Sequence, residues 1–309
     1  MRIVSLLPAA TEIVAFLGEI DSLVGVSHEC DWPPGLSDDL PRLTAPRVDA
    51  SGSSGEIDRS IREALDAGLS VYELDVDRLV ELAPDVVITQ DQCSVCAVDL
   101  GQLESGLADQ IGEEPEIVSL HPRRLGDILD NIVEVAEALG IRGDGIVKRR
   151  LLARKLDRAV GAVPLKRSRN EPPTVCFVEW LDPLMVAGHW IPDLVDRAGG
   201  RYPFVESGEP SREIDFEEIR EVDPDVVVIA PCGMGTVQMR EDLHLLTDRD
   251  GWEDLTAVRR ARVHPVDGSD YFNRPGPRIL DSLSILVRLM WPGEQHPDDT
   301  ADSIFGAPE

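Results

Sequence analysis

A stretch of seventeen residues occurs twice in the chain, and this duplication constrains the fold more than any other feature. Residues 72–88 (YELDVDRLVELAPDVVI) return 140 positions later as residues 212–228 (REIDFEEIREVDPDVVV). Seven of the seventeen positions are identical, including the Pro-Asp-Val-Val run of each copy. Because the spacing is nearly half of the 309-residue chain, the repeat predicts two similar lobes with a cleft between them.

Each copy predicts a short helix followed by a buried strand. Asp75 and Asp215 can accept hydrogen bonds from the first free amides of a helix, and the proline nine residues later ends that helix. The β-branched runs that follow, 86–89 and 226–229, are typical of strands covered on both faces in a parallel sheet. The fold class is therefore predicted as α/β, with two Rossmann-like lobes and mostly parallel sheets.

Apolar periodicity divides the rest of the chain. We expect an N-terminal lobe at 1–140, a connector helix and linker at 141–173, a C-terminal lobe at 174–291 and a flexible tail at 292–309. The connector is a single long helix predicted over 143–162. The other predicted strands are 2–7, 22–27, 85–90, 116–120, 174–179 and 262–266, and the other predicted helices include 10–18, 56–68, 75–83, 191–198, 236–246 and 277–290; residues 31–55 are predicted as a loop.

The charge of the chain limits its partners. It has 58 acidic and 30 basic residues, a net charge of −28, which argues against binding to nucleic acid or an anionic membrane. No apolar run approaches the length of a membrane span. The N-terminus shows no positively charged leader, so we expect a cytoplasmic protein whose five cysteines are thiols or ligands.

Soft ligands follow the predicted strands, where ligands bind in open α/β sheets. They are His28 and Cys30, Cys93 and Cys96, and Cys232. Three interpretations stay open: a zinc or iron–sulfur site built from these residues, a Cys-x-x-Cys redox pair, or structural thiols. Cys176 lies inside a strand and is expected to be a small buried residue.

Aromatic and polar residues gather after strands of the second lobe. They are Glu179 and Trp180, His189 and Trp190, and Tyr271, Asn273 and Arg274. Rings supply a flat contact surface and Arg pairs with anionic groups, so this set suits a large planar ligand. The chain has no nucleophile elbow, Walker loop or glycine-rich dinucleotide fingerprint, which argues against the common enzyme classes.

Several motifs resemble a known family. The opening IVSLLPAATEIVAFLG, the Gly-Val-Ser strand after it and the repeated helix–Pro-Asp-Val-Val unit resemble class III substrate-binding proteins of ABC transporters, the iron-siderophore and vitamin B12 type, over residues 1–291. SHECDWP, TQDQCSVCAV, EWLDPLMVAGHW and YFNRPGPR resemble the cobalamin-binding-protein-like branch that has no signal peptide. The resemblance implies a periplasmic-binding-protein-like clamshell whose lobes are joined by one long helix.

The resemblance also assigns roles by position. It implies ligand contacts at Pro8, Trp32, Gln90, Glu179, Trp180, His189, Trp190, Tyr271, Asn273 and Arg274. Exported relatives present one glutamate per lobe to the permease, and the matching residues are Asp77 and Glu217. Asp77 is shorter than the family's glutamate, and this departure puts docking to a permease in doubt.

Two functions are therefore predicted. The leading hypothesis is a non-catalytic substrate-binding protein that holds a corrinoid (cobalamin-like) or metal-chelate ligand in the inter-lobe cleft, with an ABC permease as a possible partner. His28 or His189 would suit cobalt as an axial ligand. The alternative is a metal- or Fe–S-dependent enzyme built on the same fold, which would use His28, Cys30, Cys93, Cys96 and Cys232.

Overall fold

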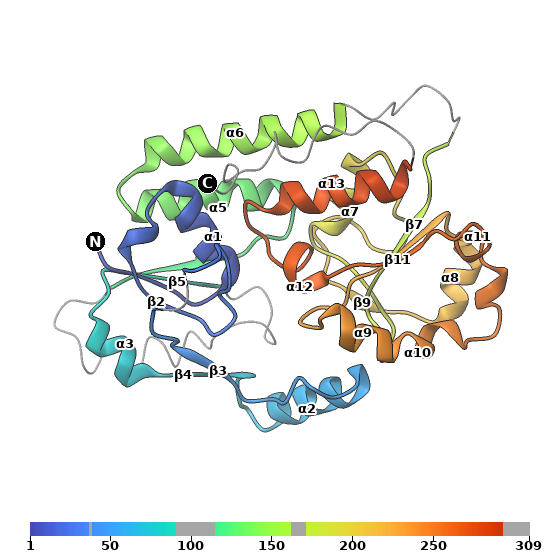
Figure 1. Cartoon of the computed structure of the whole chain (residues 1–309), viewed down its shortest axis with the longest axis horizontal. Helices are drawn as coiled ribbons and strands as arrows, with labels where there is room; N and C mark the ends of the chain where they lie inside the picture. Colours follow the sequence, from blue (N-terminus) through green and yellow to red (C-terminus); the bar gives the residue numbers. More distant parts are fainter. Residues whose placement is uncertain (37–38, 91–114, 162–170, 293–309) are drawn as a thin grey trace. The chain divides into compact units, whose positions relative to one another are not determined.

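A computed structural model describes residues 1–36, 39–90, 115–161 and 171–292 (Figure 1). The chain forms two compact units. The N-terminal unit consists of 1–49, 59–122 and 126–151, and the C-terminal unit consists of 50–58, 123–125 and the residues from 152 onward. Two short segments from the first half of the sequence, 50–58 and 123–125, thus belong to the C-terminal unit.

The N-terminal unit is built on a sheet of four parallel strands. Their order is β2 (Leu23–Val26), β1 (Ile3–Ser5), β5 (Val86–Gln90) and β6 (Glu116–Leu120). Every residue of β1 is buried, as are the first four of β5. The continuous apolar runs thus form central strands covered on both faces, as the sequence predicts.

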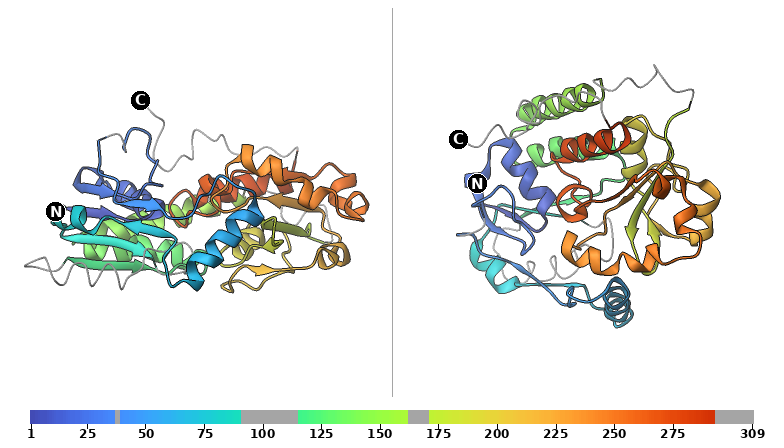
Figure 2. Two further views of the ribbon diagram at one scale, coloured as in Figure 1. Left: turned by 90° about the horizontal axis from the view of Figure 1, so that it is seen from below. Right: turned by 45° about the vertical axis from the view of Figure 1, so that its right-hand side comes forward.

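Helices belong wholly or partly to this unit together with the sheet (Figure 2). They are α1 (Pro8–Leu17), α2 (Ser54–Asp66), which begins in the C-terminal unit, α3 (Val76–Leu82), α5 (Leu125–Ala138) and the first half of α6 (Arg142–Gly161). Leu79 of α3 packs with Val4 and Val87 in a fully buried cluster. Burying a side chain of this size contributes about 1.5–3 kcal/mol, so the apolar face of α3 fixes it on the sheet.

The C-terminal unit has a mixed sheet of five strands. Its order is β11 (Val263–Pro265), β10 (Val226–Ile229), β7 (Val175–Trp180), β8 (Met185–Val186) and β9 (Arg212–Glu213). The first three strands are parallel, and β8 and β9 are antiparallel additions. The described helices are α7 (Ile191–Arg197), α8 (Phe216–Val222), α9 (Thr236–Asp242), α10 (His244–Thr247), α11 (Thr256–Arg259), α12 (Gly268–Tyr271) and α13 (Ile279–Met290).

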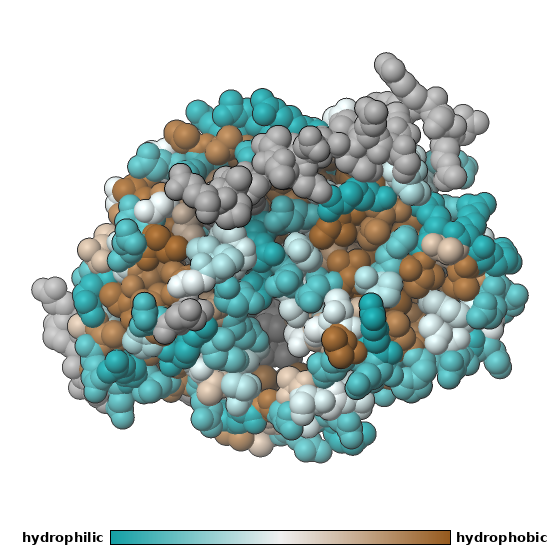
Figure 3. Space-filling model, viewed as in Figure 1, coloured by the Kyte–Doolittle hydropathy of each residue, from teal (hydrophilic) through white to brown (hydrophobic). Residues whose placement is uncertain are grey.

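The two-lobed α/β fold with mostly parallel sheets is confirmed, and α6 forms where the connector helix is predicted. The predicted loop 31–55 contains β3 (Thr44–Pro46), which pairs antiparallel with β4 (Tyr72–Leu74). The helix predicted at 236–246 is divided at Leu243 into α9 and α10. None of the helices in the described part of the chain has both the length and the apolar character needed to cross a bilayer. Hydrophilic residues cover most of the face drawn in Figure 3.

The two copies of the sequence repeat fold alike, as β4–α3–β5 and β9–α8–β10. Asp75 caps α3 by accepting a hydrogen bond from the backbone N–H of Arg78 at 2.9 Å. Asp215 begins α8 in a capping box with Glu218. Each helix ends in a residue with positive φ directly before the proline, at Ala83 and Asp223.

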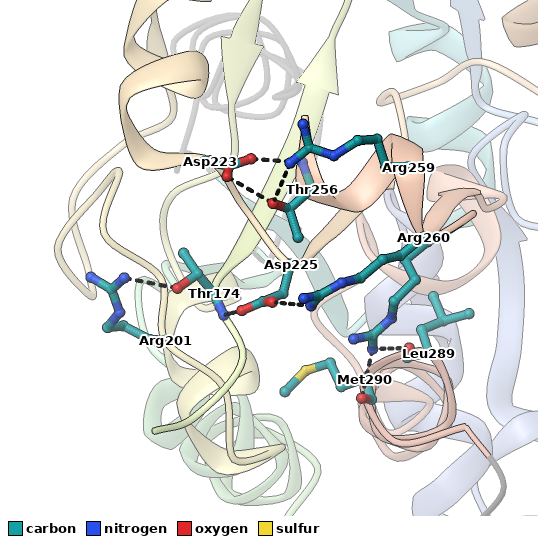
Figure 4. A network of polar contacts seen from close by, with 10 residues as sticks. Thr174, Arg201, Asp223, Asp225, Thr256, Arg259, Arg260, Leu289 and Met290 are labelled. Atoms are coloured by element: carbon teal, nitrogen blue, oxygen red, sulfur yellow. Dashed lines mark hydrogen bonds and ion pairs between the residues drawn. The ribbon is translucent and has the colours of Figure 1, made fainter. Parts of the chain in front are cut away.

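The aspartate after each proline clamps the start of the unit's first strand. Asp85 Oδ2 accepts from the N–H of Arg2 at 2.6 Å, and the N–H of Asp85 donates to the carbonyl of Arg2 at 2.8 Å. Asp225 makes the same pair with Thr174, at 3.1 and 2.8 Å, and also binds Arg260 at 3.0 Å (Figure 4). The clamp joins β5 to β1 and β10 to β7, and sets their register.

Replacing Asp225 with Ala should destabilise the β7–β10 pair. The loss removes a charge-assisted hydrogen bond to a part-buried amide, so the free energy of opening should fall by about 1–3 kcal/mol. Hydrogen exchange of the β7 amides measures it. Glu221→Ala removes the same charge from an exposed position of the same repeat and should leave this exchange unchanged. Equal effects of both variants would contradict the clamp.

Candidate functional site

The loop after β2 carries the first candidate residues, and one arginine holds it. Arg42 donates from Nη1 to the carbonyls of Ser27 at 2.7 Å, His28 at 3.1 Å and Cys30 at 2.7 Å. Three carbonyls turned toward one guanidinium fix the path of the loop. The side chain of His28 is therefore presented from a rigid backbone.

His28 is oriented by the β3–β4 pair. Its backbone N–H donates to Thr44 Oγ1 at 3.0 Å, and its Nδ1 lies 2.7 Å from the same hydroxyl. Its ring packs at 5.3 Å from the ring of Tyr72, whose hydroxyl donates to Glu29. Burial lowers the pKa of His28, with Glu29 opposing and Arg42 assisting. The imidazole is thus held neutral near pH 7 with one nitrogen already engaged.

Cys30 belongs to the same loop, and its thiol is buried. Thr11 donates from Oγ1 to its Sγ at 3.0 Å, and Ser27 Oγ lies 3.1 Å from the same sulfur. Burial raises the pKa of Cys30, although both hydroxyls oppose the shift. A protonated, hydrogen-bonded sulfur of this kind fits a structural thiol better than a metal ligand.

The metal site predicted from the cysteines is only partly within the described residues. Cys93 and Cys96 lie outside them, and Cys232 belongs to the C-terminal unit. In the described ranges no three His, Cys, Asp or Glu side chains gather as a metal ion would require. Cys176 is fully buried in β7, and burial raises the pKa of its thiol, as expected of a small core residue.

The remaining candidates of the N-terminal unit lie at one edge of its sheet. Pro8 begins α1 after β1, Gln90 is the last residue of β5, and Trp32 follows the His28 loop. All three are partly exposed. Because β2, β1 and β5 are parallel neighbours, their carboxyl ends and these residues share one edge, as the ligand-contact prediction requires.

In the C-terminal unit, Glu179 at the end of β7 organises a polar chain. Its carboxylate accepts from Ser211 Oγ at 2.6 Å, and Ser211 Oγ accepts from the N–H of Gly188 at 3.0 Å. The N–H of Cys232, after β10, donates to the carbonyl of Glu179 at 3.3 Å. The next residue, Trp180, is half-buried and donates from Nε1 to the carbonyl of Asp182 at 2.9 Å.

His189 stands in an unusual backbone conformation. Its φ is 51°, and its N–H donates to the carbonyl of Glu209 at 2.6 Å. Gly188 before it has no room for a side chain, because a Cβ would collide with that same segment. Positive φ in a non-glycine residue is uncommon and held only by surrounding structure. Burial lowers the pKa of His189, and the nearby Arg123 lowers it further.

Trp190 is a buried residue that makes contacts within the C-terminal unit. It is 7% exposed, and its indole donates to the carbonyl of Phe272 at 3.1 Å. Tyr271 is half-buried, with the guanidinium of Arg278 5.3 Å from its ring. The Trp190 bond thus ties the His189 loop to the loop that carries Tyr271.

Asn273 and Arg274 follow Tyr271 in the chain and differ in exposure. Arg274 is 8% exposed, with Asp270 3.8 Å away. The buried Nδ2 of Asn273 has no hydrogen-bond partner in the described residues. Trp180, His189 and Tyr271 are therefore partly exposed, whereas Trp190 and Arg274 are buried.

The sequence does not predict the residues that orient these side chains. Arg42, Thr44 and Ser211 lie in segments of irregular or very short structure, far from their partners in the chain. Among the orienting residues, Tyr72 has a recognisable position in the sequence, because it begins the first copy of the repeat.

The two positions matched to transporter docking are equivalent in the structure. Asp77 lies in the first turn of α3 and Glu217 in the first turn of α8, and both are exposed. Glu217 pairs with Arg220 of its own helix at 2.5 Å.

Comparison with known families shows to which protein family the chain belongs. The periplasmic binding protein family matches residues 3–268. The chain belongs to this family. It is 24% identical over 289 residues to a vitamin B12-binding protein of Vibrio parahaemolyticus, covering 91% of this chain and 86% of that one.

Solved structures show the same fold. A possible iron-binding, periplasmic solute-binding protein of Staphylococcus epidermidis superposes with a TM-score of 0.71 at 19% identity, covering 94% of this chain and 98% of that one. A periplasmic heme-binding protein of Roseiflexus gives 0.66 at 24% identity, with 94% and 97% covered.

Membership in the family tests two predictions, confirming one and overturning the other. The family consists of solute-binding proteins, so the non-enzymatic assignment is confirmed and nothing supports the metal- or Fe–S-dependent alternative. The cytoplasmic location is wrong, because the family and its solved relatives are periplasmic binding proteins. The expected location rests on N-terminal residues that form β1 and α1. These residues give information about the fold and not about the cellular location.

The lowered pKa of His189 has a testable consequence. Below its ordinary value of 6.5 the unfolded chain binds a proton that the folded chain does not, so stability falls as pH drops below about 6.5. His189→Gln should flatten this fall below about pH 6.5 in denaturant titrations. The exposed His244 provides the control variant, His244→Gln. An unchanged pH profile for His189→Gln would refute the assignment.

Proposed function

We propose that this protein is a solute receptor for a corrinoid, and that carboxyl-end loops of its two units contact the ligand. It performs no chemistry on the ligand and passes it to an ABC permease. The geometry of His28 carries this proposal. The aromatic surface of the C-terminal unit and the vitamin B12-binding relative support it.

His28 has the features of an axial ligand for a metal held in a macrocycle. A ligating imidazole must be neutral, and its second nitrogen is normally fixed by a hydrogen bond. Burial keeps His28 neutral, and Thr44 engages Nδ1. Nε2 has no hydrogen-bond partner in the described part of the chain and is the nitrogen that would bind cobalt.

The C-terminal unit offers flat surfaces for the ring system. Trp180 is the last residue of β7, His189 follows β8, and Tyr271 is the last residue of α12, which follows β11. All three are partly exposed. Aromatic faces supply large contact area at low conformational cost. Each ring is held by a separate interaction: the indole N–H of Trp180, the guanidinium beside Tyr271 and the backbone of His189.

Calorimetry with cyanocobalamin and aquocobinamide tests the ligand class. We expect dissociation constants below about 10 μM. Aquocobinamide should also change its visible spectrum on binding, because the imidazole replaces a bound water, and His28→Ala should abolish that change. His244→Ala, an exposed histidine of the same chain, should retain it. Failure of both corrinoids to bind at tens of micromolar would end the corrinoid proposal, and tight binding of haemin in their place would assign the site to haem.

Docking to a permease is proposed through Asp77 and Glu217. Both carboxylates are exposed at equivalent positions of the repeat, where a basic partner surface can reach them. Asp77→Lys combined with Glu217→Lys should abolish corrinoid uptake in cells that depend on this protein and change the ligand dissociation constant less than about twofold.

The matched control is Asp21→Lys with Glu253→Lys, two exposed acids in the same two units. Normal uptake by the Asp77/Glu217 variant would exclude this docking surface.

A further inference from the structure

Residues 50–58, which we call the strap, come from the first half of the sequence and belong to the C-terminal unit. Helix α9 holds the strap. Gln238 donates from Nε2 to the carbonyls of Ala50 at 2.7 Å and Gly52 at 2.8 Å. One side-chain amide thereby fixes the backbone of this irregular segment at two carbonyls.

A second residue of α9 holds the helix that grows from the strap. Asp242 Oδ2 accepts from the N–H of Ser54, the first residue of α2, at 2.6 Å. Asp242 is 5% exposed and Ser54 fully buried, so water does not compete for this bond. The first amides of a helix lack partners within it, and a carboxylate there is favoured by the helix dipole. Asp242 supplies this cap from a distant part of the chain.

The strap is also fixed from within. Glu56 Oε2 accepts from both the N–H and the hydroxyl of Ser53, at 2.9 and 2.8 Å. This is one half of a capping box, and it closes the turn that leads into α2. The strap is thus bound to α9 at Ala50, Gly52 and Ser54, and its turn is closed internally by Glu56.

Directly after Ser54, the strap contacts Asp182 in the loop that follows Trp180. The carboxylate of Asp182 lies directly against Gly55, where a Cβ would collide with it. The backbone carbonyl of Asp182 accepts the indole hydrogen bond of Trp180 at 2.9 Å. Gly55 therefore packs against the residue that orients Trp180.

We propose that the strap is a positioning element of the ligand site, and that Gln238, Asp242 and Gly55 set the orientation of Trp180 through Asp182. Trp180 is the half-buried last residue of β7, and its ring would otherwise lose rotational freedom when ligand binds. A strap anchored to α9 imposes that order beforehand. The consequence for ligand affinity rests on the proposed function, whereas the orientation of Trp180 does not.

Fluorine NMR of protein labelled with 5-fluorotryptophan measures that orientation without ligand. The Trp180 resonance is assigned by its loss in Trp180→Phe. Gln238→Ala should shift or broaden this resonance, leave the resonance of the buried Trp252 unchanged and speed amide exchange across 50–58 by at least about tenfold. Arg240→Ala, an exposed change in the same helix, should do neither.

Gly55→Ala provides an independent test that leaves both anchors in place. The added methyl displaces the carboxylate of Asp182, so the Trp180 resonance should move while exchange across 50–58 stays slow. This variant decides the matter should Gln238→Ala fail to fold. An unmoved Trp180 resonance in Gly55→Ala, or in folded Gln238→Ala with fast exchange across 50–58, would overturn the positioning role.

Ligand titration separates this proposal from the proposed function. If the wild-type protein binds cyanocobalamin, Gln238→Ala should weaken binding by about three- to tenfold and Arg240→Ala by less than twofold. Binding unchanged in Gln238→Ala would overturn the role in the ligand site. A moved Trp180 resonance in a protein that binds no corrinoid supports the positioning role and refutes only the choice of ligand.

Discussion

The rest of the structure depends on the two-point clamp between a Pro-Asp aspartate and the residue that precedes the first strand of each unit. The amide and the carboxylate of Asp85 both bind Arg2, and those of Asp225 both bind Thr174. Two bonds to one residue define a strand register, which a one-residue slip would destroy. Because the amino ends of the parallel strands are aligned, their carboxyl ends lie at the same edge of the sheet. In each unit the loops that follow these ends form the edge where ligands bind in open α/β sheets.

The sequence predicts this frame because its signals are local and repeated. Buried β-branched runs, Asp caps and prolines recur at fixed spacing, so the parallel strands, α3, α8 and α6 could all be placed. Strands of two or three residues, such as β3, β8 and β9, are too short to show alternation. These pieces place Thr44 and Ser211, so the residues that orient His28 and Glu179 could not be found from the sequence.

The cysteines show where a sequence pattern stops being informative. Cys30 and Cys232 lie in loops that follow β2 and β10, yet position along the chain does not give side-chain direction. The buried side chain of Cys30 contacts the hydroxyls of Thr11 and Ser27, and these contacts support the loop. Its neighbour His28, two residues earlier, remains partly exposed. Alternate residues of one loop thus differ in exposure: Cys30 is buried in the structure, and His28 is accessible.

The strap makes the two halves of the gene unequal despite their shared repeat. A product cut between residues 140 and 174 would leave Gln238 and Asp242 of the second half without the backbone groups they hold. A buried carboxylate deprived of its partner is costly, so the second half expressed alone would lack a part of its own structure. The duplication is therefore visible in the sequence, but the protein it produced can no longer be divided into two self-sufficient modules.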